Sequence, residues 1–162
     1  MSPRTPLPPR LYFSYGQFLV YDCGVKAPGS LWTDAHSAQG FARRESTVSF
    51  GTLLEFGHAD VFYCRGAFRH DGAHERVIAV PFSVFTGKIM VDGPEEVGIA
   101  RTFGLPLGNY RIVAAQRLVG GGEELVELFA EKLDDALGES RVIIADDLLN
   151  PPVRLVETAE IA

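Results

Sequence analysis

The chain contains few cysteines and no long hydrophobic run. Cys23 and Cys64 are its two cysteines in 162 residues, too few for a small secreted fold held by disulfides, so we expect free thiols. No run of about 18 apolar residues occurs, and we expect no membrane insertion. Residues 1–10 hold four prolines and no apolar segment like that of a secretory signal. We therefore expect residues 1–10 to form a flexible proline-rich arm before a single domain over residues 11–162. Without a secretory signal segment, we expect a cytoplasmic protein.

Motifs for catalysis and cofactor binding are scarce as well. The G-x-S-x-G motif is absent, and glycines 120–122 lack the following Lys and Ser/Thr of a phosphate-binding loop. His70 and His74, followed by Glu75, have a spacing that chelates a metal on a helix, but their neighbours are typical of a loop. We therefore expect no enzyme activity, metal or cofactor. A metal-dependent β-fold enzyme that uses these three residues is kept as an alternative.

Charge is distributed unevenly along the chain. The net charge is −6. Residues 1–90 carry nine Lys/Arg and seven Asp/Glu, whereas residues 91–162 carry six Lys/Arg and fourteen Asp/Glu, which gives +2 and −8. An acidic half argues against direct nucleic-acid binding, because phosphates repel carboxylates. Such a field favours a basic protein partner, and it is equally typical of a solvated surface that keeps a protein soluble.

Most of the chain shows the period-two pattern of β-strands. In residues 76–85, Ile78, Val80, Phe82 and Val84 share one face, as in a half-buried strand. Pro81 places this strand at an edge or at a bulge. With 46% apolar residues, the pattern predicts a mainly β, single-domain antiparallel β-sandwich. Further strands are expected at 11–15, 17–22, 47–56, 59–65, 88–91, 109–119 and 141–145.

Two segments break the alternation and predict one or two short helices. Residues 34–44 follow Thr33, a suitable N-cap, and end in Arg43 and Arg44, which suit a last turn, although Gly40 weakens the helix. Residues 123–137 carry both helical and alternating apolar patterns. Because three glycines precede them, we expect a strand through Glu131 and then a turn or short helix.

Several motifs, none specific alone, occur in an order that resembles the competence protein J (ComJ) family over residues 11–159. They are Ser14-Tyr15-x-x-Phe18-x-Val20-x-Asp22, Trp32-Thr33-Asp34, Gly40-Phe41-Ala42-Arg43-Arg44, Val80-Pro81-Phe82-x-Val84, Gly93-Pro94-Glu95-Glu96, Leu105-Pro106-x-Gly108-x-Tyr110-Arg111, Leu128-Phe129, Ser140-Arg141 and Ala145-Asp146. This resemblance implies a non-enzymatic protein that binds and silences a DNA-degrading competence nuclease. It carries no residue-level inhibitory motif.

The candidate partner-binding residues therefore come from charge. Carboxylates on one side of a sandwich would imitate a row of phosphates and fill a cleft built for DNA. We expect this role for Asp92, Glu95, Glu96, Asp146 and Asp147, and we add Arg43 and Arg44 as the most prominent basic pair. The alternatives are a small-ligand-binding sandwich, an immunity protein to another toxin and a structural subunit. A homo- or hetero-oligomeric state stays open.

Overall fold

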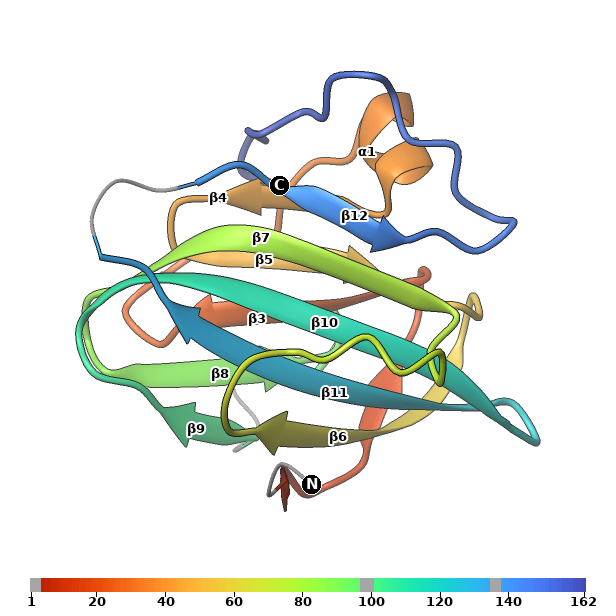
Figure 1. Ribbon diagram of the computed structural model, residues 1–162, viewed down its shortest axis with the longest axis horizontal. Coiled ribbons are helices and arrows are strands. Elements are labelled where there is room, and N and C mark those ends of the chain that lie inside the picture. Colours follow the sequence, from red (N-terminus) through yellow and green to blue (C-terminus); the bar gives the residue numbers. More distant parts are fainter. Residues whose placement is uncertain (1–3, 97–100, 135–137) are drawn as a thin grey trace.

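The computed structural model describes residues 4–96, 101–134 and 138–162, which form two β-sheets and one short helix (Figure 1). The larger sheet has the order β1-β6-β11-β10-β7-β12, and β2 also pairs with β6. Its strands are β1 (Arg4–Pro6), β2 (Leu11–Phe13), β6 (Gly57–Cys64), β7 (Arg76–Val84), β10 (Gly108–Gly120), β11 (Glu123–Lys132) and β12 (Arg141–Ile144). The prediction of a mainly β fold is confirmed.

The smaller sheet has the order β4-β5-β3-β8-β9. Its strands are β3 (Gln17–Asp22), β4 (Phe41–Arg44), β5 (Thr47–Gly51), β8 (Lys88–Asp92) and β9 (Thr102–Gly104). The main core lies between the two sheets. Phe18 and Phe50 from the smaller sheet, and Phe82, Ile112 and Leu128 from the larger one, are completely buried in it.

The outer face of the larger sheet is also covered, which the alternating pattern did not predict. Val77 and Ala79 of β7 point away from the main core, yet they are buried in a second cluster with Val113 and Phe129. The segment between β6 and β7 covers this cluster, and the Phe68 ring meets the Phe129 ring edge-on. Strand β7 is therefore buried on both faces rather than half-buried.

One strand pair departs from the antiparallel arrangement. Strands β6 and β11 run parallel, with Glu123 opposite His58 and Phe129 opposite Cys64. Strands β10 and β11 form the hairpin that glycines 120–122 predict. Strand β11 ends at Lys132, as expected. The helix that was the alternative after Glu131 falls partly on residues 135–137, outside the described ranges.

Pro81 lies where one side of β7 has no neighbouring strand. On one side β7 pairs with β10 through Val84, but on the other side β12 reaches only as far as Ala79. The Pro81 carbonyl accepts a hydrogen bond from Arg43 Nε at 3.2 Å instead of from a strand. The expected edge position is therefore correct, because a missing N–H costs nothing on that side.

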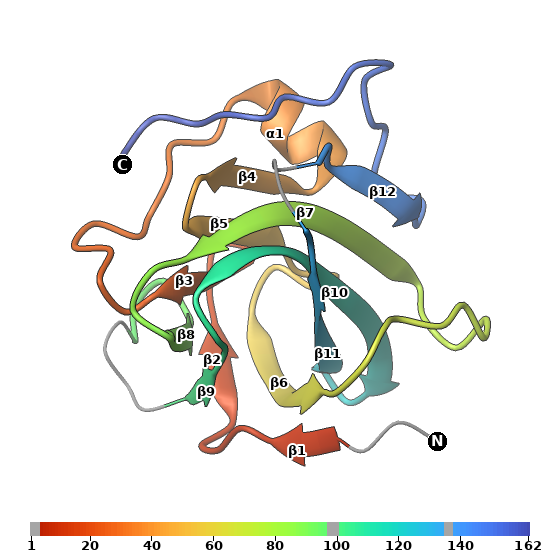
Figure 2. The same cartoon turned by 60° about the vertical axis from the view of Figure 1, so that its left-hand side comes forward.

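The helix is shorter than the sequence indicated. Helix α1 spans Asp34–Gln39, and the Thr33 hydroxyl caps it by accepting a hydrogen bond from the His36 amide. Gly40 ends it with a left-handed φ of 88°. Arg43 and Arg44 therefore belong to strand β4 rather than to a last helical turn. Figure 2 shows α1 above β4, beside the C-terminal segment.

The segment expected to be a loose arm is docked from residue 4 onward. Strand β1 pairs with β6, the Leu7 amide donates to the Val61 carbonyl at 2.9 Å, and the Leu7 side chain is buried in the main core. Pairing and burial fix residues 4–10 against the sheet, which prolines alone do not reveal. The limits of the single domain, residues 11–162, stay a prediction.

Candidate partner-binding site

The two predicted arginines hold loops of their own chain. Arg43 is buried, and its Nη1 donates to the Glu157 carbonyl at 2.9 Å. Arg44 Nη2 donates to the carbonyls of Ala27 and Gly29 at 2.5 and 2.8 Å. Both guanidinium groups thus anchor chain segments next to β4, and this geometry supports a structural role for them.

The acidic residues after β8 also have internal contacts. Asp92 is completely buried, accepts a hydrogen bond from Tyr21 Oη at 2.5 Å, and lies 3.6 Å from the buried Arg101 guanidinium. Glu96 pairs with the same guanidinium at 3.3 Å. Glu95 is exposed. Asp92 therefore points into the interior of its own chain, and the assignment of these acids to a partner surface stays a prediction.

The acidic residues after β12 divide in the same way. Asp146 forms an ion pair with Arg76, with 2.6 Å between Oδ1 and Nε, whereas Asp147 is exposed. Strand β8 lies in the lower part of the molecule and β12 in the upper part in both ribbon views (Figures 1 and 2). The two acidic groups therefore do not form one continuous surface.

A row of polar residues on three neighbouring strands marks one end of the sandwich. Arg76, Gln116 and Glu124 share the inner face with Val80, Ile112 and Leu128, because they differ from these core residues by an even number of positions. Arg76 and Gln116 are opposite each other in the β7–β10 register. All three are buried, and buried polar groups need hydrogen-bond partners.

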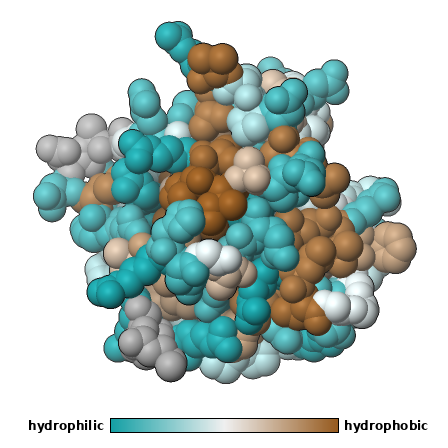
Figure 3. All heavy atoms as spheres, turned by 45° about the vertical axis from the view of Figure 1, so that its right-hand side comes forward, coloured by the Kyte–Doolittle hydropathy of each residue, from teal (hydrophilic) through white to brown (hydrophobic). Residues whose placement is uncertain are grey.

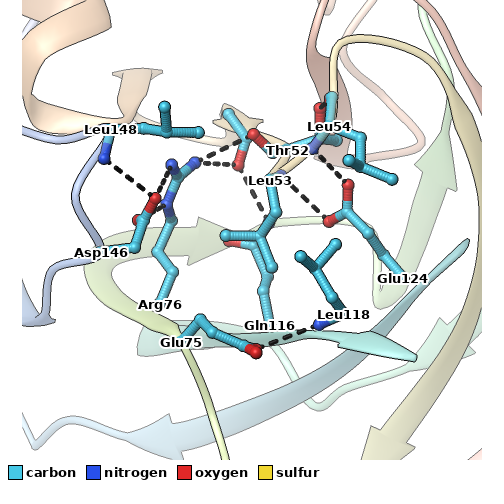
Figure 4. Close-up of polar contacts among 11 residues, drawn as sticks. Thr52, Leu53, Leu54, Glu75, Arg76, Gln116, Leu118, Glu124, Asp146 and Leu148 are labelled. Carbon is cyan, nitrogen blue, oxygen red and sulfur yellow. Dashed lines mark hydrogen bonds and ion pairs between the residues drawn. The ribbon is translucent and has the colours of Figure 1, made fainter. Parts of the chain in front are cut away.

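Arg76 joins the two sheets to the segment after β12 (Figure 4). Its Nε and Nη2 donate to the two carboxylate oxygens of Asp146 at 2.6 and 3.1 Å, and its Nη1 donates to the carbonyls of Gly51 and Thr52 at 2.8 and 3.2 Å. Burial disfavours charge on Asp146, but the Arg76 hydrogen bond and charge outweigh it and hold the pKa of this carboxyl below its usual value.

Glu124 holds the loop that follows β5. Its two carboxylate oxygens accept hydrogen bonds from the amides of Leu53 and Leu54 at 3.1 and 2.8 Å. Burial raises the pKa of Glu124, and the two amides offset part of that rise. The loop is fixed from a second side because Gln116 Nε2 donates to the Gly51 carbonyl at 2.9 Å.

A hollow of about 340 Å³ opens beside this polar row. The Arg76 side chain forms part of its wall, and Tyr15, Trp32, Leu148 and Leu149 supply apolar surface. Trp32 is only half-buried, and its indole Nε1 donates to Gln17 Oε1 at 3.1 Å. Figure 3 shows apolar side chains gathered between hydrophilic ones on the right-hand side of Figure 1, where the turn before β3 and the loop after β5 lie.

Tyr15 has a strained backbone in this hollow. It was expected at the end of a strand, but it lies in the turn between β2 and β3 with a φ of 57°, and Gly16 follows with a φ of 64°. The left-handed conformation costs an ordinary residue about 1–2 kcal/mol. The Tyr15 side chain is 75% exposed, so core packing does not compensate for this cost. Strain of this kind clusters at functional sites.

The histidines of the alternative metal site have other contacts. His74 Nε2 lies 2.7 Å from Glu127 Oε1, and the exposed Glu75 accepts a hydrogen bond from the Leu118 amide at 3.0 Å. In the described part of the chain, no group of three His, Cys, Asp or Glu side chains has a geometry that could hold a metal ion. Cys23 is an exposed free thiol. Cys64 is a buried one, whose pKa burial raises to about 12.

A sequence model of the family competence protein J (ComJ) matches residues 10–134. The chain belongs to the ComJ family. No curated protein sequence matches it. None of the helices within the described ranges is long and apolar enough to cross a membrane.

Two solved structures share the fold. The crystal structure of ComJ from Bacillus subtilis, described as an inhibitor of the DNA-degrading activity of NucA, has a TM-score of 0.69 and 21% identity. The similarity covers 82% of this chain and 99% of that one. A second structure, described as crocagin biosynthetic gene J, has a TM-score of 0.52 and 13% identity, over 80% of this chain and 99% of that one.

Sequence reasoning missed the polar row of this ComJ-family chain, although a signal was present. A charged residue at an inward-facing position of an apolar strand costs free energy unless it has partners. Arg76 precedes Ile78 and Val80 by even steps, and Glu124 precedes Val126 in the same way. Residues an even number of positions from a core residue on the same strand lie on the same face, and this rule identifies Arg76 and Glu124 as buried.

Proposed function

We propose that this protein is a non-enzymatic inhibitor that binds a DNA-degrading nuclease directly and blocks its DNA-binding cleft. Membership of the ComJ family carries the proposal, since the family model spans residues 10–134 and the solved relative with the same fold inhibits a nuclease. We place the protein in the cytoplasm.

The proposed mechanism is electrostatic occlusion. A cleft that binds DNA is lined with basic groups, and residues 91–162 of this chain have a net charge of −8. Among the predicted acids, Glu95 and Asp147 are exposed and free to approach such groups, whereas Asp92 is buried. Glu96 and Asp146 stay in the proposed surface, although each of them is paired with an arginine of its own chain, Arg101 and Arg76 respectively.

The test is a DNA-degradation assay with a purified nuclease encoded beside this gene. Increasing amounts of the protein should stop cleavage completely near a fixed molar ratio, and a complex should elute from a sizing column. Unchanged cleavage without a complex would refute the proposal. Saturable binding of a small molecule would then support the ligand-binding alternative, and protection against a different toxin would support the immunity alternative.

Charge reversal separates occlusion from other modes of inhibition. Glu95→Lys and Asp147→Lys, each alone, should slow association and reduce its dependence on salt, because exposed charges act mainly on the on-rate. Glu160→Lys, at another exposed acid, is the matched control. If both variants inhibit with wild-type rates at low and high salt, these carboxylates do not meet the nuclease.

A further inference from the structure

We propose that the hollow beside Arg76 receives an arginine or lysine side chain of the nuclease. This inference rests on the proposed function and names the place where the partner docks. It assigns a binding role to Tyr15, Trp32 and Leu148, which none of the charge-based predictions included.

The walls of the hollow suit the stem of a long side chain. Tyr15 and Trp32 present aromatic surface, and Leu148 is 69% exposed at the rim. Aromatic faces attract cations, and long basic side chains pack their methylene groups on apolar surface while the charged end stays near water. Apolar side chains that gather on one exposed surface, rather than singly, are typical of interaction sites.

Exposed acidic residues stand beside the residues that line the hollow, and they are called the acidic rim below. Each of three wall segments carries an exposed carboxylate. Asp147 precedes Leu148, Asp34 begins helix α1 close to Trp32, and Glu55 adjoins the Tyr15 turn because its carbonyl accepts the Gly16 amide at 2.7 Å. Negative charge on the segments around the hollow therefore attracts a basic group. An acidic group would be repelled by the same charges.

The charge in the wall does not oppose a basic guest. Among the described residues that line the hollow, Arg76 is the only one with a charge. The Arg76 side chain is 3% exposed, and its guanidinium makes a two-bond pair with the Asp146 carboxylate, so the two charges largely cancel. The remaining field comes from the acidic rim, which makes the site complementary to a cation.

The strained turn is the second observation that points to a partner. Asparagine or glycine would adopt the φ of 57° at position 15 at lower cost. Tyrosine at this position, with 75% of its side chain exposed, lowers stability and gains little within the fold. Tyrosine is among the residues that most often anchor a protein interface.

Tyr15→Asn separates a binding role from a structural one. The variant should have an equal or higher Tm, because the turn loses its strain, and it should bind the nuclease at least about tenfold more weakly, because an aromatic anchor is removed. If Tyr15 served only the fold, its substitution would not raise Tm and weaken nuclease binding at the same time.

A second pair of variants tests the rim. Leu148→Ala should weaken binding by a similar factor. Leu107→Ala is the matched control, because Leu107 is a leucine of comparable exposure, 62%, that does not line the hollow. The double variant Glu55→Gln with Asp147→Asn should slow association and weaken its salt dependence, whereas Asp134→Asn with Glu139→Gln, at two other exposed acids, should leave both unchanged.

Trp32 provides a direct reading of the hollow. It is the single tryptophan of the chain, so its fluorescence reports this site alone. Titration with N-acetyl-argininamide should change the emission saturably, N-acetyl-aspartamide should not, and Glu55→Gln with Asp147→Asn should weaken the effect. This measurement does not depend on the nuclease.

The outcomes distinguish the two proposals. If the nuclease is inhibited and Tyr15→Asn and Leu148→Ala inhibit like the wild type, the hollow is not the docking site, while nuclease inhibition stands. If the nuclease is not inhibited, the proposed function fails, and the fluorescence titration decides the chemistry of the hollow. Emission that does not respond to N-acetyl-argininamide, or responds equally to the aspartate derivative, overturns the assignment of a basic guest.

Discussion

Removal of the Arg76 side chain should destabilise the fold by an amount that depends on pH. Arg76→Met keeps the apolar stem but removes a guanidinium that is 3% exposed and donates four hydrogen bonds within 3.2 Å. Two of these reach Asp146, which is 15% exposed and gains some water in the variant. The other two reach the carbonyls of Gly51 and Thr52.

The expected loss is about 3 kcal/mol near neutral pH. A buried ion pair broken on one side costs about 3–5 kcal/mol, and the partial exposure of Asp146 places this case at the low end. Gly51 keeps the hydrogen bond from Gln116, so the Thr52 carbonyl is the main acceptor left unpaired. For a chain of this size the loss corresponds to a Tm lower by roughly 6–12 °C.

The pH dependence follows from Asp146. Its pKa is lower in the folded protein than in the unfolded chain, so the ion pair stabilises the fold above the unfolded value and this contribution is lost as pH falls through the folded pKa. The difference between wild type and Arg76→Met should therefore shrink in acid, where Asp146 is protonated in both proteins.

Urea unfolding followed by circular dichroism at several pH values measures this difference. Arg111→Met is the matched control, because Arg111 is 39% exposed and its closest approach to Glu131 is 3.5 Å. Exposed pairs of this kind contribute about 0–1 kcal/mol. A loss below about 1 kcal/mol for Arg76→Met, or an equal loss at acid and neutral pH, would refute the reasoning.

Three further predictions concern other buried groups. Asp22→Ala should cost about 3 kcal/mol in unfolding free energy, because the Asp22 carboxylate accepts three backbone amides and one hydroxyl; a loss no larger than that of an exposed acid, such as Glu160→Ala, would contradict this. Because the pKa of Glu124 is higher in the folded protein than in the unfolded chain, this residue lowers the stability of the wild type as pH rises from the unfolded pKa through the folded pKa. Glu124→Gln should abolish this decline. A decline of equal slope in both proteins would contradict the prediction. Gly93→Ala should lower Tm, because the new methyl group would collide with the Tyr12 carbonyl. The control is Gly138→Ala, where the new methyl group meets only the Arg111 side chain at 3.8 Å, and it should change Tm little. Gly121 is unsuitable as a control, because it has open space around it but a left-handed φ of 64°.

Local patterns were sufficient where one residue decides the structure by its own chemistry. Thr33 caps α1 as predicted, and glycines 120–122 form the turn between β10 and β11. Pro81 lies at an open side of β7, because a residue without an N–H cannot be paired on both sides. The length of α1 was less predictable, because the sequence indicated a helix through Arg44, whereas Gly40 ends it with a left-handed φ and Arg43 and Arg44 continue in β4.

Charge along the sequence does not reveal which of the predicted acids are accessible, because a sequence does not show which charges are paired. Asp92 and Asp146 lie near exposed acids in the chain, yet each pairs with an arginine, Arg101 and Arg76 respectively. Asp147 and Glu95, one or a few positions away, remain exposed. Neighbours along a strand or turn point in different directions, so a run of acids does not define a surface.

The sequence by itself determined the β-rich fold, the positions of most strands and the family, because alternation, turn residues and motif order are local properties of the chain. The tertiary structure alone decided where the hollow lies. Tyr15, Trp32, Arg76 and Leu148 come from four separate segments, and they meet only because β3, α1, β7 and the segment after β12 pack at one end of the sandwich. Long-range packing sets such a site, and spacing along the chain carries no record of it.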